Sequence, residues 1–284
     1  MKRYLFLLLV PLVPLVQNRV DEGLGGKSSA ERPLYLTSAD QVRSLAPGFT
    51  SMMADLYWLK TVQYFGAQRA FVDDPHYAQL RPLIDITTGL DPRFEFAYRY
   101  GAVFLSEVRP LGAGRPTEGL EVLQAGIRHI PQSWRLRWDL GSFYFVFMQD
   151  PKKAAETLIE AARLPNAPYW LESLAGKFLM GNDRHAARDI WQRQAETGEG
   201  MMRENAVYHL RVIEALDRRD LIQQQVERFR ESRGRPPQDL AELVSAGLLR
   251  AVPVDPENVA FDYNSEKGRV SISRSSRLWR SKYE

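Results

Sequence analysis

The chain has 284 residues, a formal net charge of +3 and no cysteine, and 44% of its residues are hydrophobic, 26% charged and 11% aromatic. This length suffices for a buried core, and the composition excludes both a disordered chain and a polytopic membrane protein. The lack of cysteine excludes disulfides, thiolate metal sites, cysteine nucleophiles and a lipidated cysteine tether, and the small net charge does not call for nucleic acid or acidic lipid.

Residues 1–20 are typical of a signal peptide or membrane anchor. Lys2 and Arg3 precede an uncharged apolar run at residues 4–16, which is shorter than the roughly 20 residues of a spanning helix. No cleavage site of the A-x-A type follows closely, so cleavage and retention both stay open. Either way the positive charges stay in the cytoplasm. We therefore expect export to the periplasm, with residues 4–16 as an inner-membrane anchor if they are retained.

Residues 21 to about 33 are polar and rich in glycine and serine, which predicts a flexible spacer over 21–36. The triplet Gly26-Lys27-Ser28 resembles the end of a phosphate-binding loop. That loop also requires a glycine where this chain has Asp21, and no apolar strand leads into it. Nucleotide binding is therefore not expected here.

A helical region is predicted for residues 37–232. Its first long amphipathic stretch, residues 49–72, has apolar side chains at helical spacing, and we expect them to form one buried face. These residues are Met52, Leu56, Leu59, Val62 and Phe65. The stretch is also dense in aromatic residues, for which a ligand or peptide groove is the alternative to core packing.

Residues 133–168 carry two amphipathic helical patterns joined by a turn. The first places Leu140, Gly141 and Tyr144 on one face, and the second repeats Ala154, Leu158 and Ala161 at i, i+4 and i+7 before Pro165. Small residues at these offsets predict two antiparallel helices in close contact.

The same offsets recur on both sides of this segment, at a spacing near the roughly 34 residues of a known repeat class. Upstream are Tyr100, Gly101 and Phe104 followed by Gly119, Leu123, Gly126 and Pro131, and before them Leu80, Ile84, Thr87 and Pro92; downstream are Leu174, Ala175 and Phe178 followed by Ala187 and Trp191.

Residues of about 50 to 200 therefore resemble a tetratricopeptide-repeat array with three fair copies and one degenerate copy. Trp138 lies one place from its position in the family pattern, and Ala175 replaces the usual glycine. Two further predicted helices, 201–216 and 221–230, have the position of a capping pair, with a solvated turn at 217–220. The resemblance implies an all-α fold, an antiparallel helix-hairpin solenoid that extends to about residue 230.

Residues 233–273 form a different, small module. We expect a short helix at about 237–246, and a β-hairpin of strands 260–263 and 269–273 across residues 264–268. The basic tail, residues 274–284, is expected to be a frayed end, and contact with an anionic surface is the alternative.

This module resembles a motif of exported bacterial proteins, including the soluble ends of type II secretion pseudopilins. The matching residues are Gly234-Arg235-Pro236, Leu240 with Leu243, Gly247 with Leu249, Pro253 with Pro256, and Phe261 with Tyr263. The pseudopilin's long N-terminal membrane helix is absent. The resemblance implies an exported setting.

No motif for catalysis, cofactor binding or metal binding stands out. The histidines are His76, His129, His185 and His209, and none has a partner at zinc-binding spacing. There is no nucleophile elbow and no dinucleotide fingerprint. We therefore expect a protein that is not an enzyme and has no cofactor, although acidic groups brought together only by folding would escape this search.

In tetratricopeptide arrays the first helix of each pair lines the concave side, and partly exposed aromatic and arginine side chains there are candidate partner contacts. The repeat register selects Glu95, Tyr98 and Leu105, then Arg135, Trp138 and Phe145, then Tyr169 and Glu172. Packing between repeats is the alternative role for Trp138 and Phe145. The expected function is a scaffold for a protein or peptide partner in a bacterial envelope, secretion or pilus-type assembly. The alternative is an exported hydrolase with a helical repeat domain.

Overall fold

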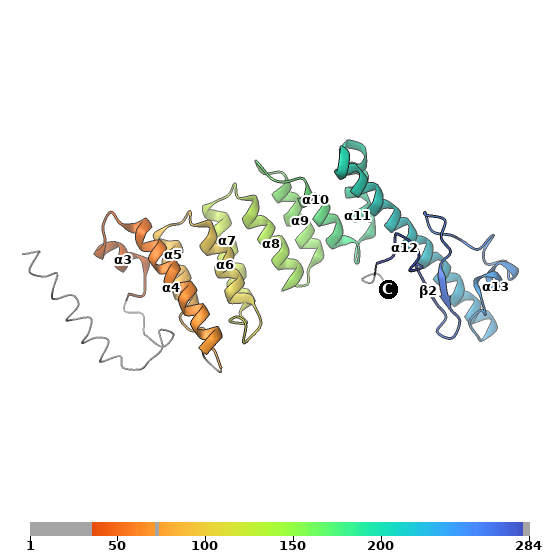
Figure 1. Ribbon diagram of the computed structural model, residues 1–284, viewed down its shortest axis with the longest axis horizontal. Helices are drawn as coiled ribbons and strands as arrows, with labels where there is room; N and C mark the ends of the chain where they lie inside the picture. Colours follow the sequence, from red (N-terminus) through yellow and green to blue (C-terminus); the bar gives the residue numbers. More distant parts are fainter. Residues whose placement is uncertain (1–35, 72–73, 281–284) are drawn as a thin grey trace, which may run out of the picture. The chain divides into compact units, whose positions relative to one another are not determined.

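The computed structural model describes residues 36–280 except 72 and 73, so the predicted leader and nearly all of the spacer lie outside the described residues. The described chain is mostly helical and ends in a two-stranded sheet (Figure 1). Its elements are α3 (Ala39–Leu45), α4 (Thr50–Phe71), α5 (Leu80–Leu90), α6 (Glu95–Ser106), α7 (Pro116–His129), α8 (Trp134–Val146), α9 (Pro151–Ala162), α10 (Trp170–Leu179), α11 (Arg184–Thr197), α12 (Gly200–Arg233), α13 (Leu240–Ser245), β1 (Asp262–Asn264) and β2 (Arg269–Ser271). The all-α fold class is confirmed at this level.

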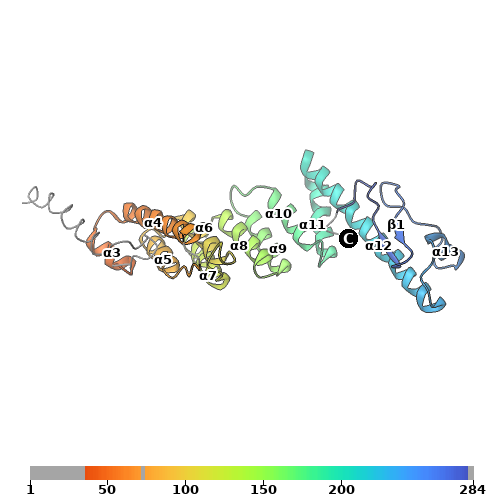
Figure 2. The same ribbon diagram turned by 60° about the horizontal axis from the view of Figure 1, so that its bottom comes forward.

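The chain divides into two compact units, Met1–Leu140 and Gly141–Glu284, and the division falls within α8. In the first unit α4 packs on α5, α5 on α6, and α6 on α7. In the second unit α9 packs on α10, α10 on α11, and α11 on α12. Both views of the ribbon show these consecutive helices side by side (Figures 1 and 2).

Several helices begin at residues whose chemistry favours a helix start. The carboxylates of Asp150 and Asp183 accept hydrogen bonds from backbone N–H groups in the first turns of α9 and α11. Proline occupies the first helical position of α7 and α9. Both devices satisfy or remove the backbone donors that a helix start leaves without partners.

Glycine lets helices approach closely at the predicted contacts. A Cβ atom on Gly141 would lie 2.9 Å from Leu158 Cγ, and one on Gly126 would lie 2.7 Å from Tyr98 Cγ. In the following copy the close contact is made by Gly176, one position after the predicted Ala175. There a Cβ atom would lie 2.8 Å from the Trp191 ring. Small residues therefore fix the depth at which large neighbours pack.

The predicted buried face of α4 is wrong. Of its five residues only Phe65 is buried, and the other four are exposed. The helix packs through another face, because Tyr64 accepts a hydrogen bond from the Gln79 N–H at 3.1 Å and Phe65 stacks on Phe104 at 4.0 Å. Since α4 carries apolar residues on both faces, periodicity alone selected the wrong one.

The predicted capping pair is also wrong, because residues 200–233 form one continuous helix, α12. Asp217 and Asp220, predicted to lie in a turn, instead accept hydrogen bonds from Arg184 of α11, and Arg188 also donates to Asp217. No glycine or proline occurs at 201–233 to interrupt the helix.

The predicted C-terminal hairpin forms, with shorter strands than predicted and the first one shifted toward the turn. β1 and β2 are antiparallel, and Tyr263 lies opposite Val270. The side chain of Gln223 in α12 holds the hairpin, since it accepts from the Val270 N–H and donates to the Gly268 carbonyl, both at 2.8 Å.

The described part of the basic tail, residues 274–280, is not frayed. Leu278 is fully buried, and its N–H donates to Ser276 Oγ at 3.1 Å. The Ser276 hydroxyl in turn donates to the Asp255 carboxylate. These contacts anchor the segment to the module before it.

Arg235 stabilises the start of α13 through Glu242, which leads to a prediction about pH. The guanidinium and the Gln238 N–H both donate to the Glu242 carboxylate, and together they lower its pKa from 4.5 to about 2. A carboxyl whose pKa is lowered by folding stabilises the fold at pH values above its ordinary pKa of 4.5. This stability is lost as the pH falls through the folded-state pKa of about 2. We expect NMR titration of Glu242 to give a midpoint near 2 and Arg235→Met to raise it. A midpoint at the ordinary value in the unaltered protein would contradict the ion pair.

Candidate functional site

A row of exposed apolar side chains runs along α6. Phe96, Tyr100 and Val103 are 54%, 42% and 39% exposed, and their i, i+4, i+7 spacing puts them on one face of the helix. The Phe96 and Tyr100 rings stack at 4.9 Å. A contiguous exposed aromatic row on a helix with a well-packed opposite face is typical of an interaction surface. We call these three residues the α6 row.

Aromatic packing against α4 holds one side of the α6 row in place. The Phe104 ring stacks on Phe65 at 4.0 Å and lies parallel to Trp58 at 6.1 Å. Trp58 also meets Phe94 edge to face at 6.0 Å. Because these rings are large and have few rotatable bonds, they orient α6 firmly relative to α4.

Charged and aromatic side chains of α8 border the α6 row on its other side. Arg99 of α6 donates to both carboxylate oxygens of Asp139, lies 4.0 Å from Glu95, and has its guanidinium 5.7 Å from the Trp138 ring centre. We call the whole group the α6–α8 cluster; it comprises Glu95, Arg99, Trp134, Arg135, Trp138 and Asp139. Within it, Arg135 lies over the Trp134 ring at 4.6 Å.

Partial burial shifts the pKa of two ionisable groups of this cluster. Burial raises the pKa of the Asp139 carboxyl, and the hydrogen bond from Arg99 offsets only part of that increase. Burial opposes the charge of Arg99, yet the bond to Asp139 leaves its pKa raised. A guanidinium fixed between a carboxylate and an indole is a positioned cation, and such groups recognise planar or anionic partners.

Six of the eight predicted partner contacts have a side chain at or near the surface. Glu95, Arg135 and Trp138 belong to the α6–α8 cluster. In the second unit, Tyr169 is exposed, Phe145 stacks on Phe178 at 3.9 Å while staying partly exposed, and Glu172 lies 3.4 Å from the Gln194 amide nitrogen. The first three belong to one cluster, which is linked to the α6 row through Arg99 and Glu95 of the same helix.

The prediction that Tyr98 and Leu105 contact a partner is wrong, because these side chains are only 2% and 0% exposed. Tyr98 packs against Gly126 of α7, and burial raises its pKa to about 12. The repeat register had predicted the wrong orientation of α6 about its axis, with Tyr98 and Leu105 facing outward and Tyr100 facing inward. The α6 row has helical spacing of its own, so a signal for it was present in the sequence, but the same spacing is typical of core.

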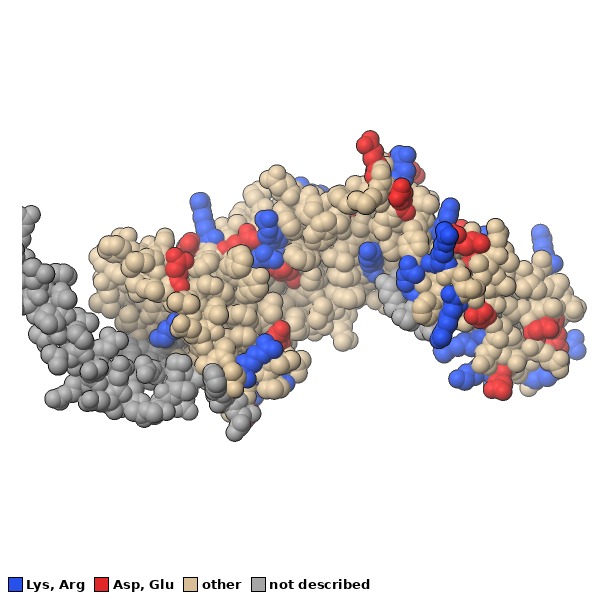
Figure 3. All heavy atoms as spheres, in the orientation of Figure 1, with Lys and Arg blue, Asp and Glu red and all other residues tan. Residues whose placement is uncertain are grey.

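The second unit contains a basic hollow of about 880 Å³ between α12, the hairpin and residues 274–280. Five cationic residues line it, Arg219, Lys267, Arg269, Arg274 and Arg280, against two acidic residues, Asp220 and Glu227. Figure 3 shows lysine and arginine side chains gathered over α12 and the C-terminal segment. The lining of this hollow is therefore basic, whereas the α6 row is apolar.

No known protein family, curated protein or solved structure matches the chain. Among residues 36–280, no helix combines the length and apolar character needed to cross a membrane. The described residues also contain no group of three or more metal-ligating side chains.

Proposed function

We propose that the protein is a non-enzymatic scaffold of the tetratricopeptide-repeat type that binds a protein or peptide partner. The partner lies along the exposed faces of α6 and α8, over the α6 row and the α6–α8 cluster. The observation that carries this proposal is the exposed row of Phe96, Tyr100 and Val103 on a helix whose other faces are packed.

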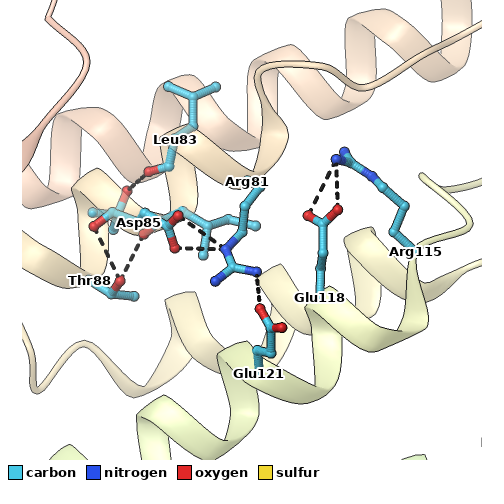
Figure 4. A network of polar contacts seen from close by, with 9 residues as sticks. Arg81, Leu83, Asp85, Thr88, Arg115, Glu118 and Glu121 are labelled. Atoms are coloured by element: carbon cyan, nitrogen blue, oxygen red, sulfur yellow. Dashed lines mark hydrogen bonds and ion pairs between the residues drawn. The ribbon is translucent and has the colours of Figure 1, made fainter.

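Contacts between helices two apart in the chain support the repeat architecture. In the first unit, α4 meets α6 through Phe104, and α6 meets α8 through Arg99. Between the second helices of two successive pairs, Arg81 of α5 donates to Glu121 of α7, and it also donates to Asp85 of its own helix, both at 2.9 Å (Figure 4). Stacked helix hairpins produce this pattern of alternate-helix contacts.

The chemistry of the surface indicates the kind of partner. Two stacked aromatic rings and a valine favour an apolar segment, since aromatic side chains bury large areas with few rotatable bonds. The Arg99–Asp139 pair, whose arginine is on the same helix as the row, and Arg135 of the α6–α8 cluster favour a partner with an acidic or hydrogen-bonding group at its edge. An amphipathic helix or an extended apolar peptide fits both requirements.

We place the scaffold at the outer face of the bacterial inner membrane, in an envelope, secretion or pilus-type assembly. The basic residues Lys2 and Arg3 and the apolar run at 4–16 support export. A retained run would tether the helical region through the spacer that follows it.

An exported hydrolase with chemistry in the C-terminal part is the alternative function. It would need an acid poised to exchange protons near neutral pH. At the basic hollow, burial raises the pKa of Asp220, but hydrogen bonds from Arg184 and Arg219 outweigh it and leave the pKa lowered. That carboxylate is better suited to orient arginines than to act as a general acid.

The proposal predicts that Phe96→Ala together with Tyr100→Ala stays folded and loses the partner. Two exposed aromatic contacts together supply about 2 to 4 kcal/mol in typical interfaces, so partner recovery should fall by at least about tenfold. The measurement is quantitative mass spectrometry of proteins retained by the full-length chain from solubilised membranes. Leu111→Ala, which truncates a similarly exposed side chain elsewhere in the unit, is the matched control. Equal recovery by the double variant and the control would place the binding site elsewhere.

A further inference from the structure

The outward face of α4 and the residue just before it carry an apolar stripe that the other described residues leave exposed. Phe49, which precedes the helix, and Met52, Leu56 and Leu59 on it are 60%, 51%, 50% and 53% exposed. Their spacing of three, four and three residues continues through Gln63 and Gly66. The stripe is about 25 Å long at 1.5 Å per residue. We call these six positions the α4 stripe.

The spacing is that of a heptad seam. Phe49, Leu56 and Gln63 occupy a positions, and Met52, Leu59 and Gly66 occupy d positions. A seam of this kind packs knobs into holes on a second helix. Apart from the surrounding turns of α4 itself, no atom of the described residues lies within 4 Å of the place where a Cβ on Gly66 would be, so the far end of the stripe is open to a neighbour.

The charges beside the stripe are complementary to a second copy of α4. Asp55 lies at the g position and Lys60 at the e position five residues later, and both are exposed. In a parallel pair of helices a g side chain meets the e side chain of the following heptad on its partner, so Asp55 meets the partner's Lys60 twice by symmetry. In an antiparallel pair g positions face each other, and this match is lost.

We infer that the protein forms a parallel homodimer through α4. A two-fold axis runs along the stripe, and the a and d residues of one copy pack on the same residues of the other. Gln63 at an a position puts one polar residue in the seam, and alignment of the two Gln63 side chains favours the register in which they meet. Because α4 is already folded against α5, pairing two short seams does not require either helix to form first.

The dimer has a consequence for binding. Parallel pairing places the N-terminal ends of both α4 helices at the same end of the pair, which is compatible with the proposed tethering of both chains to one membrane. It also presents two copies of the α6 row in one particle. A partner with two binding segments, or a partner that is itself dimeric, would then be held with increased avidity.

Cysteine crosslinking tests the dimer directly, because the chain has no cysteine of its own. In the full-length protein in its membranes, Met52→Cys should form a disulfide-linked dimer on mild oxidation, at least about tenfold more than Leu111→Cys. Met52 and Leu111 are 51% and 52% exposed, so the two thiols are equally accessible. Crosslinking no greater than that of the control overturns the dimer.

Charge reversal then tests the parallel register. On the Met52→Cys background, Asp55→Lys and Lys60→Asp should each weaken crosslinking, and the double reversal should restore it. A mixture of the two single reversals should crosslink better than either one alone. If the double reversal is no better than the single ones, the parallel register is overturned. If crosslinking is absent and Leu56→Glu abolishes flotation with phosphatidylglycerol-containing vesicles, a lipid surface occupies the stripe and the dimer is rejected.

Discussion

Replacing Trp191 by alanine is expected to lower the free energy of unfolding by about 3 to 5 kcal/mol. The indole is fully buried, stacks on His209 at 4.2 Å and fills the space that Gly176 leaves on α10. Its truncation leaves a cavity between α10, α11 and α12 that the glycine cannot fill. The loss lies toward the lower end of the range, because the buried Trp191 N–H has no hydrogen-bond acceptor among the described residues and its removal relieves that cost.

Urea unfolding followed by circular dichroism measures this effect. Trp134→Ala is the matched control, since that indole is only partly buried and lies under the guanidinium of Arg135. Trp134→Ala should lower the free energy of unfolding by no more than about 1 kcal/mol. If both variants unfold at the same urea concentration, Trp191 does not hold these helices together.

Replacing Gly141 by leucine is expected to lower the free energy of unfolding by about 1 to 3 kcal/mol. The new Cβ would lie 2.9 Å from Leu158 Cγ and 3.1 Å from the backbone oxygen of Ala154. A side chain can rotate away from such a contact, whereas a helix backbone moves only if α8 and α9 separate. The variant therefore loses packing between these two helices.

Leucine has a higher intrinsic helix propensity than glycine, so this effect alone would stabilise the variant. The same substitution at a second helical glycine therefore serves as the control. Gly66 is also helical, but apart from the surrounding turns of α4 no atom of the described residues lies within 4 Å of the place where its Cβ would be. Gly66→Leu should leave the melting temperature unchanged or raise it, because leucine favours the helix by roughly 1 kcal/mol. A Gly141→Leu protein that melts at or above the unaltered temperature would show that α8 and α9 are not in tight contact.

The helix pairs were predictable because their contacts are local. Gly141 and Leu158 belong to a single helix hairpin, so the small and large residues that meet there recur at fixed offsets along the chain. The β-hairpin was predictable for the same reason, since its two strands flank one short turn that contains Gly268.

The failures come from contacts between distant parts of the chain. The charged segment at 217–220 has the composition of a turn, but it continues a helix whose acids meet Arg184 and Arg188. The C-terminal residues were expected to fray, whereas the Ser276 hydroxyl donates a hydrogen bond to Asp255, which is 21 residues away in the chain. Composition describes the segment alone and does not include such partners.

The candidate site was only partly predictable, for a related reason. Tyr98 and Tyr100 are chemically identical and face opposite ways, and the hollow at Gly126 decides which of them is buried. The repeat register gave the correct helices, α6 and α8, but for α6 the wrong rotation. On α4, apolar residues cover both faces, and only its packing on α5 shows which face is left for a second partner.

Site-specific photocrosslinking in intact cells is the most direct test of the central claim that the α6 face binds a partner. A photoreactive residue at Val103, beside Tyr100, should give a crosslinked species heavier than the protein itself, and Phe96→Ala with Tyr100→Ala should abolish it. The same residue at Arg128, which is exposed on α7, should give none. Crosslinks at Arg128 and not at Val103 would contradict the assignment and place the partner on the second helices of the pairs.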